Sequence, residues 1–206
     1  MTHQDKNTMT TPTHEHAKAI DADRRRLLLG SGLTLGAVAF AGLGWTSRAL
    51  AADPATVHVV IFDDTGRKLG DRAVPAVKKT VAQWHRQLSS AEFNILRESG
   101  TERAFSGSYS KPDRPGFYRC QGCGNALYSA ATQFHSGTGW PSFWQPIAAE
   151  NISRQSDGSF GMQRTAIACT QCESHLGHVF NDGPQPTGLR YCMNSVALRF
   201  VATGAA

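Results

Sequence analysis

The 206-residue sequence has no internal repeat and no low-complexity segment, which excludes a repeat protein and a largely disordered chain. It also lacks a basic stripe with interleaved aromatic side chains. The net charge of +5 is therefore weak evidence for a nucleic-acid partner, and part of the basic excess falls in residues 1–52. With 40% hydrophobic and 18% charged residues, the composition is ordinary for one globular domain with a tail. We expect no nucleic-acid partner.

Charged residues are also missing from an apolar stretch near the N-terminus, Leu27 to Trp45. Arg24 to Arg26 stand directly before it, and Ala49 and Ala51 form a small-residue A-x-A site after it. This order is typical of a secretory signal, and the arginine pair suits the twin-arginine route. We predict a signal peptide with a polar extension over residues 1–51 and a periplasmic or exported protein. The alternative is a retained anchor, which would be the chain's only contact with a membrane.

The segment after the predicted signal shows one strand and two helices. His58 to Phe62 is β-branched and apolar, which predicts a short strand before a turn. Apolar residues at helical spacing predict a helix from Val77 to Leu88. A second helix is expected over Ala91 to Glu98, with Ser89 or Ser90 as its N-cap and with Gly100 at its end.

From Phe105 onwards, short apolar runs alternate with Gly, Pro, Ser and Asn. The runs are Phe117–Arg119, Ala126–Tyr128, Ala166–Ala168 and Val196–Val201. They predict a compact antiparallel β domain with two short helices at its N-terminal side. We accordingly divide the mature chain into an N-terminal arm over residues 52–76 and a domain over residues 77–206.

Four of the five cysteines form two C-x-x-C pairs, Cys120 with Cys123 and Cys169 with Cys172. In each pair a tight turn brings two thiolates to one metal ion, and two such turns complete a tetrahedron. Four thiolates leave no open coordination position, so we predict one structural zinc that ties distant segments together. Two alternatives are disulfides in an oxidising compartment and a thioredoxin-type redox pair, although no βαβ unit accompanies either motif.

Three features outside the cysteine pairs are candidates for chemistry. Cys192 is left without a partner, so it is either a small buried side chain or a nucleophile whose thiolate Arg190 would favour. His175 and His178, three residues apart, are either a proton-handling or ligand pair or structural histidines. The Gly-flanked Trp140 precedes a proline, and its ring either faces a ligand or packs in the core.

Together these segments resemble the B-type methionine sulfoxide reductases, from about Val77 to Phe200. The order and spacing of the matching segments are highly specific, whereas no single one decides. They are GTE at 100–102 with FSG at 105–107, the first C-x-x-C-G, SGTGWPSFW at 136–144, GMQRT at 161–165, HLGHVFNDGP at 175–184 and TGLRYCMNS at 187–195.

The resemblance implies a fold of two antiparallel sheets and reduction of the R epimer of methionine sulfoxide, mainly in oxidised proteins. Cys192 would be the nucleophile that becomes a sulfenic acid. A proton donor beside the sulfoxide oxygen would be His178, with His175 and Asn194. Trp140 would form an apolar cup for the methyl group, with Phe180 lining it. A thioredoxin-like or other external thiol would be the reductant.

Two positions depart from the pattern of these relatives. Many relatives have a resolving cysteine where this chain has Thr138, so no free thiol remains to form a disulfide with Cys192. Either an external thiol reduces the sulfenic acid, or a zinc ligand serves as the resolver. Relatives often have Glu where this chain has Ala166, and we expect a modest effect.

Two other classes of function compete with a reductase. One is a binding module that presents Trp140 and the histidine pair to a partner without turnover. The other is a zinc hydrolase that uses His175, His178 and an acid such as Asp182, although the sequence has no H-E-x-x-H motif.

Overall fold

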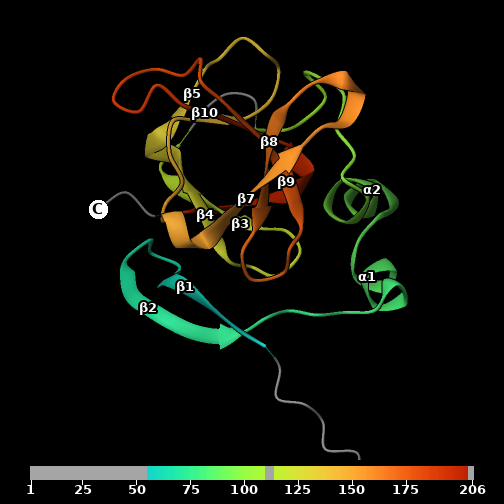
Figure 1. Cartoon of the computed structure of the whole chain (residues 1–206). Helices are drawn as coiled ribbons and strands as arrows, with labels where there is room; N and C mark the ends of the chain where they lie inside the picture. The colour runs from blue at the N-terminus through green and yellow to red at the C-terminus, as the bar shows by residue number, and fades with distance from the viewer. Residues whose placement is uncertain (1–54, 110–113, 204–206) are drawn as a thin grey trace, which may run out of the picture. The chain divides into compact units, whose positions relative to one another are not determined.

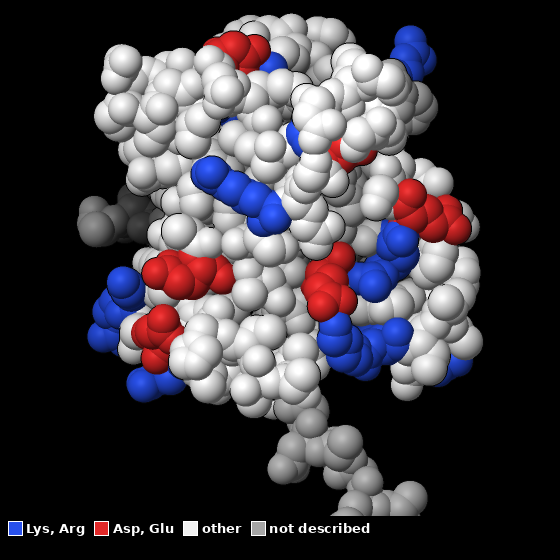
Figure 2. All heavy atoms as spheres, in the orientation of Figure 1, with Lys and Arg blue, Asp and Glu red and all other residues white. Residues whose placement is uncertain are grey.

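A computed structural model describes residues 55–109 and 114–203, so the predicted signal segment, 1–51, lies outside the described residues. The described part is mainly β, with three antiparallel sheets and two helices, in agreement with the predicted class. Within these two ranges no helix is long and apolar enough to cross a membrane. On the face drawn in Figure 2, acidic and basic side chains are interspersed rather than gathered by sign.

The larger sheet has six strands in the order β5-β6-β10-β9-β8-β7, and each pair of neighbours is antiparallel. In that order the strands are β5 (Gln133–Phe134), β6 (Ser142–Phe143), β10 (Arg190–Met193), β9 (His175–Phe180), β8 (Arg164–Cys169) and β7 (Ile152–Asp157). Strands β7 to β9 form the orange ribbon in Figure 1. Short connections join these three consecutive strands. Their antiparallel pairing fixes which residues of β7, β8 and β9 lie opposite one another.

The second sheet has three strands, β11 (Leu198–Ala202), β3 (Gly116–Cys120) and β4 (Ala126–Ser129). Aromatic rings from the two sheets pack together: Tyr128 of β4 stacks on Phe143 of β6 at 4.4 Å between centroids. Tyr118 of β3 meets the same Phe143 edge-on at 5.2 Å. All three are almost fully buried, so aromatic packing joins the sheets into one core. Short 3₁₀ helices connect the strands: η1 (Ala130–Thr132), η2 (Ala149–Asn151), η3 (Ser159–Gly161) and η4 (Ser195–Ala197).

The first helix, α1 (Val81–Gln87), starts later than the spacing predicts. Thr80 forms a capping box with Gln83, in which each side chain accepts a hydrogen bond from the other residue's backbone N–H. That cap fixes the first turn at Val81. Val77, predicted to begin the helix, instead donates its N–H to the carbonyl of Gln171 at 2.8 Å.

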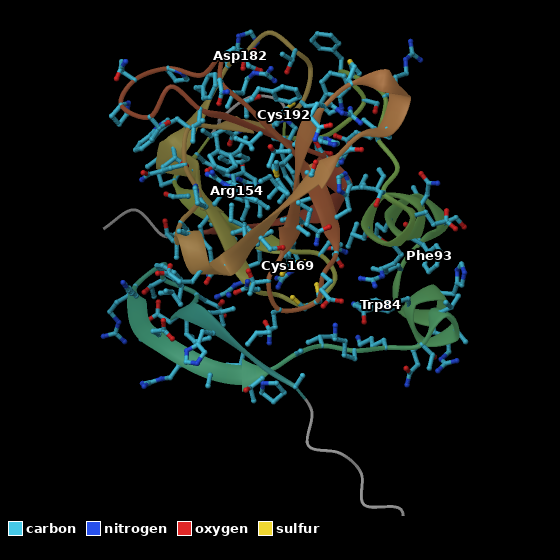
Figure 3. All side chains as sticks on the ribbon, viewed as in Figure 1. Trp84, Phe93, Arg154, Cys169, Asp182 and Cys192 are labelled. Atoms are coloured by element: carbon cyan, nitrogen blue, oxygen red, sulfur yellow. The ribbon has the colours of Figure 1, made fainter. Side chains whose placement is uncertain are left out.

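The second helix, α2 (Ser90–Glu98), has Ser89 as its N-cap, one of the two residues predicted. The helix ends at Glu98, as predicted, but the left-handed residue that follows it is Ser99, at φ 57°, rather than Gly100. The buried faces of the two helices join the main core through Trp84, Leu88, Phe93, Ile95 and Leu96. Figure 3 labels Trp84 on α1 and Phe93 on α2.

A hairpin of β1 (Thr56–Phe62) and β2 (Lys68–Pro75) precedes the helices. The predicted strand His58–Phe62 is confirmed, whereas β2 was not predicted. Asn151, fully buried, attaches the hairpin: its Oδ1 accepts from the N–H of Val60 at 2.7 Å, and its Nδ2 donates to the Val60 carbonyl at 2.9 Å. Its Nδ2 also donates to the carbonyl of Ala126 at 2.7 Å.

Candidate active site and zinc site

The four predicted zinc ligands come together at the ends of β3 and β8. Their sulfur atoms all lie within 4.8 Å of one another, with Cys120 3.6 Å from Cys172 and Cys123 3.6 Å from Cys169. A tetrahedron with Zn–S bonds of about 2.3 Å needs sulfurs about 3.8 Å apart, whereas a disulfide needs about 2.05 Å. The donor set and its spacing therefore fit one zinc, and they do not fit two disulfides.

The two zinc-binding turns share one backbone design. Gly124 and Glu173 each follow the second cysteine of a pair, both have positive φ, and each donates its N–H to the carbonyl of the first cysteine at 2.8 Å. The first turn uses glycine for this left-handed position, while the second uses a non-glycine residue at φ 58°. The pairs thus form two similar knuckles that face the same point.

Cys192 lies in the middle of a row of residues that crosses the six-stranded sheet. On β10 it is paired with Ser142 of β6 on one side and with His178 of β9 on the other. The row continues through Ala166 of β8 to Gln155 of β7. Directly opposed residues in antiparallel strands share a face, so Cys192 and His178 point to the same side of the sheet. Figure 3 shows Cys192 well apart from Cys169.

A β-bulge brings His175 to the same side as His178. Residues three apart in a regular strand point to opposite faces. The register between β8 and β9 shifts at Ile167 and Ala168, so that Ala168 is paired with His175 rather than with Leu176. The two imidazole rings meet edge-on with centroids 5.3 Å apart, so the structure brings the predicted pair together.

A small cavity of about 120 Å³ opens above this row. Nine residues from five segments line it: Thr101, Trp140, Arg164, Gly177, His178, Phe180, Cys192, Met193 and Asn194. Gly177 is required here because a Cβ at this position would lie 2.1 Å from the carbonyl oxygen of Cys192. The predicted nucleophile, proton donor and apolar cup thus meet around one space, while His175 lies behind His178.

Trp140 and Asn194 are held by the backbone of Glu102. The Trp140 indole N–H donates to the Glu102 carbonyl at 3.1 Å, and the Glu102 N–H donates to Asn194 Oδ1 at 2.9 Å. Asn194 Nδ2 also donates to the carbonyl of Leu176 at 3.1 Å. These hydrogen bonds orient the amide of Asn194, the predicted partner in proton donation, which also lines the cavity. The carboxylate of Glu102 in turn accepts from the N–H of Ser195 at 2.6 Å.

The environment of the Cys192 sulfur is mixed. Burial raises the pKa of the Cys192 thiol above its ordinary value, although the charge of Arg190 and hydrogen bonds from Thr138, Ser142 and Arg190 act against it. The expectation that Arg190 favours the thiolate is right in direction, but burial outweighs it. Arg190 is itself held by two hydrogen bonds to Asp182, at 2.9 and 2.7 Å. Asp182 thus pairs with an arginine, and neither imidazole is bonded to it.

His178 has a carboxylate partner that the sequence analysis missed. Its Nε2 lies 2.7 Å from Asp157 Oδ2, and Arg164 Nη2 donates to the same oxygen at 2.7 Å. Asp157 stands twenty-one residues before His178 and reaches it across β8. The sequence around Asp157 could not predict this contact, because the contact depends on the pairing of three strands.

A known protein family matches the part of the chain that contains both sites. The family model of the SelR domain matches residues 88–202, which is more than half of the chain and contains every residue of both sites. The chain belongs to the SelR family. The SelR domain begins near the end of α1, so the hairpin β1-β2 precedes the matched region.

Proteins named peptide methionine sulfoxide reductase MsrB are similar to the SelR domain of this chain. The one from Leptospira interrogans is 50% identical over 124 residues, which are 60% of this chain and 95% of the relative. The one from Thiobacillus denitrificans is 53% identical over 122 residues, 59% of this chain and 92% of the relative. The one from Bradyrhizobium diazoefficiens is 52% identical over 123 residues, 60% of this chain and 88% of the relative.

Proposed function

We propose that this chain is an exported peptide-methionine (R)-S-oxide reductase, which returns oxidised methionine in proteins to methionine. The assignment of an oxidoreductase of this family is carried by the SelR match and the similar MsrB proteins. The observation that supports the mechanism is the cavity that joins the Cys192 sulfur, the His178 imidazole and the Trp140 indole. The zinc on the four other cysteines supplies structure, because its four thiolates leave no open position for substrate.

The chemistry follows from the three cavity residues. The Cys192 thiolate attacks the sulfoxide sulfur while His178 gives a proton to the oxygen, and the oxygen passes to the cysteine. The balance is Cys–S⁻ plus R₂SO plus H⁺ to Cys–SOH plus R₂S, so the cysteine sulfur is oxidised by two electrons and the sulfoxide is reduced by two. Trp140 and Phe180 receive the apolar end of the side chain.

An assay with separated epimers tests this function. The purified chain with dithiothreitol is expected to convert dabsyl-methionine R-sulfoxide to dabsyl-methionine and to leave the S-sulfoxide unchanged. Reduction of both epimers at equal rates would contradict the stereochemistry, and reduction of neither would contradict the function.

Regeneration of Cys192 requires a thiol from outside the chain. Thr138, not cysteine, lies beside the nucleophile, with its Oγ1 3.9 Å from the Cys192 sulfur. The other four cysteines are committed to the zinc site. Attack of an external thiol on the sulfenic acid releases water and gives a mixed disulfide, and a second thiol then frees Cys192. A thioredoxin-like protein or a small thiol supplies both equivalents.

Single turnover without reductant is expected to stop at the sulfenic acid of Cys192. Intact-mass spectrometry should show a gain of about 16 Da, and dimedone should label Cys192, because no second thiol is placed to condense with it. A loss of about 2 Da together with release of zinc would contradict this and would make a zinc ligand the resolver.

Thr138→Cys should convert the same chain to a disulfide-forming type, because a sulfur at this place lies within bonding reach of Cys192 after a small rotation. In that variant the mass after single turnover should fall by about 2 Da while zinc content stays unchanged. Ser136→Cys is the matched control in the same loop, since Ser136 contacts Thr138 and Ser142 and not Cys192. It should still stop at the sulfenic acid.

The reactivity of Cys192 is expected to rise with pH through and above the neutral range, because burial raises the pKa of its thiol and the thiolate is the nucleophile. Arg190→Met removes the positive charge that opposes this rise. It should move the pH midpoint of iodoacetamide alkylation upward by about one unit, which slows alkylation about tenfold at pH 7.5. Arg72→Met, on the exposed strand β2, is the control and should leave the midpoint unchanged. A midpoint that does not move in Arg190→Met would refute the electrostatic role.

Export is supported by the arginine run, the apolar stretch and the Ala-rich site in residues 24–51. A twin-arginine route carries folded proteins, so zinc could be loaded onto reduced thiolates before export. Changing Arg24, Arg25 and Arg26 to Lys should leave uncleaved precursor inside the cell, as seen by fractionation and immunoblotting. Unchanged export would exclude the twin-arginine route.

A further inference from the structure

We propose that Asp157 is a positioning residue that holds a proton on His178 and leaves the Nδ1 edge of the ring for the substrate. The inference deepens the proposed function, since it rests on His178 as the proton donor to the sulfoxide oxygen. It concerns a carboxylate on β7 that reaches the row of Cys192 and His178 from two strands away.

The carboxylate of Asp157 is fixed at both of its oxygens. Oδ1 accepts from the backbone N–H of Ser159 at 2.9 Å, and Oδ2 meets both His178 Nε2 and Arg164 Nη2 at 2.7 Å. Hydrogen bonds from Ser159, and then from His178, together with the charge of Arg164, hold the pKa of Asp157 well below its usual range. The carboxylate is therefore anionic throughout the pH range in which enzymes of this kind are assayed.

This contact decides which nitrogen of His178 can serve the reaction. With Nε2 engaged by Asp157, the remaining ring nitrogen is Nδ1. A neutral imidazole that donates from Nε2 to the carboxylate has a bare Nδ1, which accepts a proton but cannot give one. Proton donation from Nδ1 needs the doubly protonated ring, and an anionic oxygen in contact with Nε2 stabilises that form.

The other groups around His178 do not replace Asp157. Its neighbour His175 is neutral in this range, because burial and then the proximity of His178 lower its pKa to about 4. Arg190, which would disfavour a proton on the ring, is paired with Asp182, whereas Arg164 shares Asp157 Oδ2 with His178. Other groups on this side are the Cys192 thiol in the substrate cavity and two carboxylates, Glu98 and Glu173, which line a second cavity of about 470 Å³ behind the ring.

The strand between Asp157 and His178 offers no acid of its own. Ala166 of β8 stands directly opposite His178, where its methyl group cannot bond to the imidazole. Among residues 55–109 and 114–203, Asp157 is the one carboxylate with a hydrogen bond to His178. Opposed residues have Cβ atoms about 5 Å apart, so a longer acidic side chain at 166 would reach the ring.

The test replaces the charge and keeps the shape. In Asp157→Asn, ¹⁵N NMR of the His178 ring in the zinc-loaded protein should show that the proton is no longer held preferentially on Nε2, because the anionic acceptor is gone. The ratio of the wild-type rate to the variant rate for R-sulfoxide reduction should be about ten at pH 8 and should fall as the pH is lowered. KM should change less than the rate, because the carboxylate does not touch the substrate.

Two further variants make the result specific. Asp71→Asn removes the carboxylate of a second histidine–aspartate pair, which joins exposed His58 and Asp71 at 3.1 Å, and should change neither the rate nor the proton position on His178. Asp157→Asn combined with Ala166→Glu should recover most of the loss at pH 8. An unchanged proton position on the His178 ring, or a rate loss that is equal at every pH, would overturn the role of Asp157. A changed proton position on the His178 ring with an unchanged rate would instead overturn His178 as the proton donor.

Discussion

Cys192→Ser is expected to abolish sulfoxide reduction, with a loss of at least about 10⁴-fold in kcat/KM. The serine hydroxyl is a far weaker nucleophile than a thiolate and cannot take up the oxygen as a reducible sulfenic acid. In the described part of the chain, the other four thiols are gathered at the zinc site and do not line the cavity. The measurement is turnover of dabsyl-methionine R-sulfoxide with dithiothreitol in excess.

The same variant separates the competing classes of function. A binding module would retain its affinity for an oxidised peptide and would show no turnover even with Cys192 present. A hydrolase built on His175 and His178 would be indifferent to the change. Zinc content and melting temperature serve as controls and should stay at their wild-type values, because Cys192 belongs to a different cluster from the four ligands. Residual turnover within tenfold of wild type would contradict the role of Cys192.

Cys169→Ser is expected to unfold the domain. Cys169 is fully buried, and its sulfur lies 3.6 Å from that of Cys123. Zinc on four thiolates contributes about 10–16 kcal/mol of apparent binding free energy, which matches or exceeds the about 5–15 kcal/mol that keeps an ordinary domain folded. Circular dichroism should show no cooperative melting transition, and elemental analysis should fall from about one zinc per chain to none.

Removing zinc from the wild-type protein should have the same effect as Cys169→Ser. A strong chelator should release the metal slowly and unfold the chain with it, whereas the Cys192→Ser protein should behave like wild type in both respects. Protein that is folded without metal, with a mass four hydrogens lower than expected, would mean two disulfides and would contradict the zinc site.

The sequence predicted the two sites better than the path of the chain between them. A C-x-x-C pair predicts a metal site because its two ligands are close together in the sequence. The fold then has to bring only two such pairs together. Helix starts are also local, but Val77 failed as a helix start because the capping box at Thr80 competes with hydrophobic spacing. Strand β2 was not predicted because it is largely exposed. Its sequence lacks the alternation of apolar and polar residues that marks a half-buried strand.

Residues that act through strand pairing were beyond sequence reasoning. The spacing of His175 and His178 is odd for a strand, and only the bulge between β8 and β9 places the two rings on one side. Asp157 reaches His178 because three strands align, which no local motif encodes. Asn194, predicted to assist proton donation, is oriented by the backbone of Glu102 and Leu176, which lie far from it in the sequence.

The attachment of the N-terminal hairpin has a practical consequence for engineering. One buried amide, that of Asn151, provides both hydrogen bonds that a neighbouring strand would have given to Val60. The hairpin lies outside the SelR match and contains none of the residues of either site. Its tip, the turn from Asp63 to Gly66, is closed by its own hydrogen bonds and bonded to Arg119 of β3, and none of its residues lines the cavity. A fluorescent label, an affinity peptide or a surface tether inserted at this tip would therefore have a rigid mount at a distance from the catalytic cysteine.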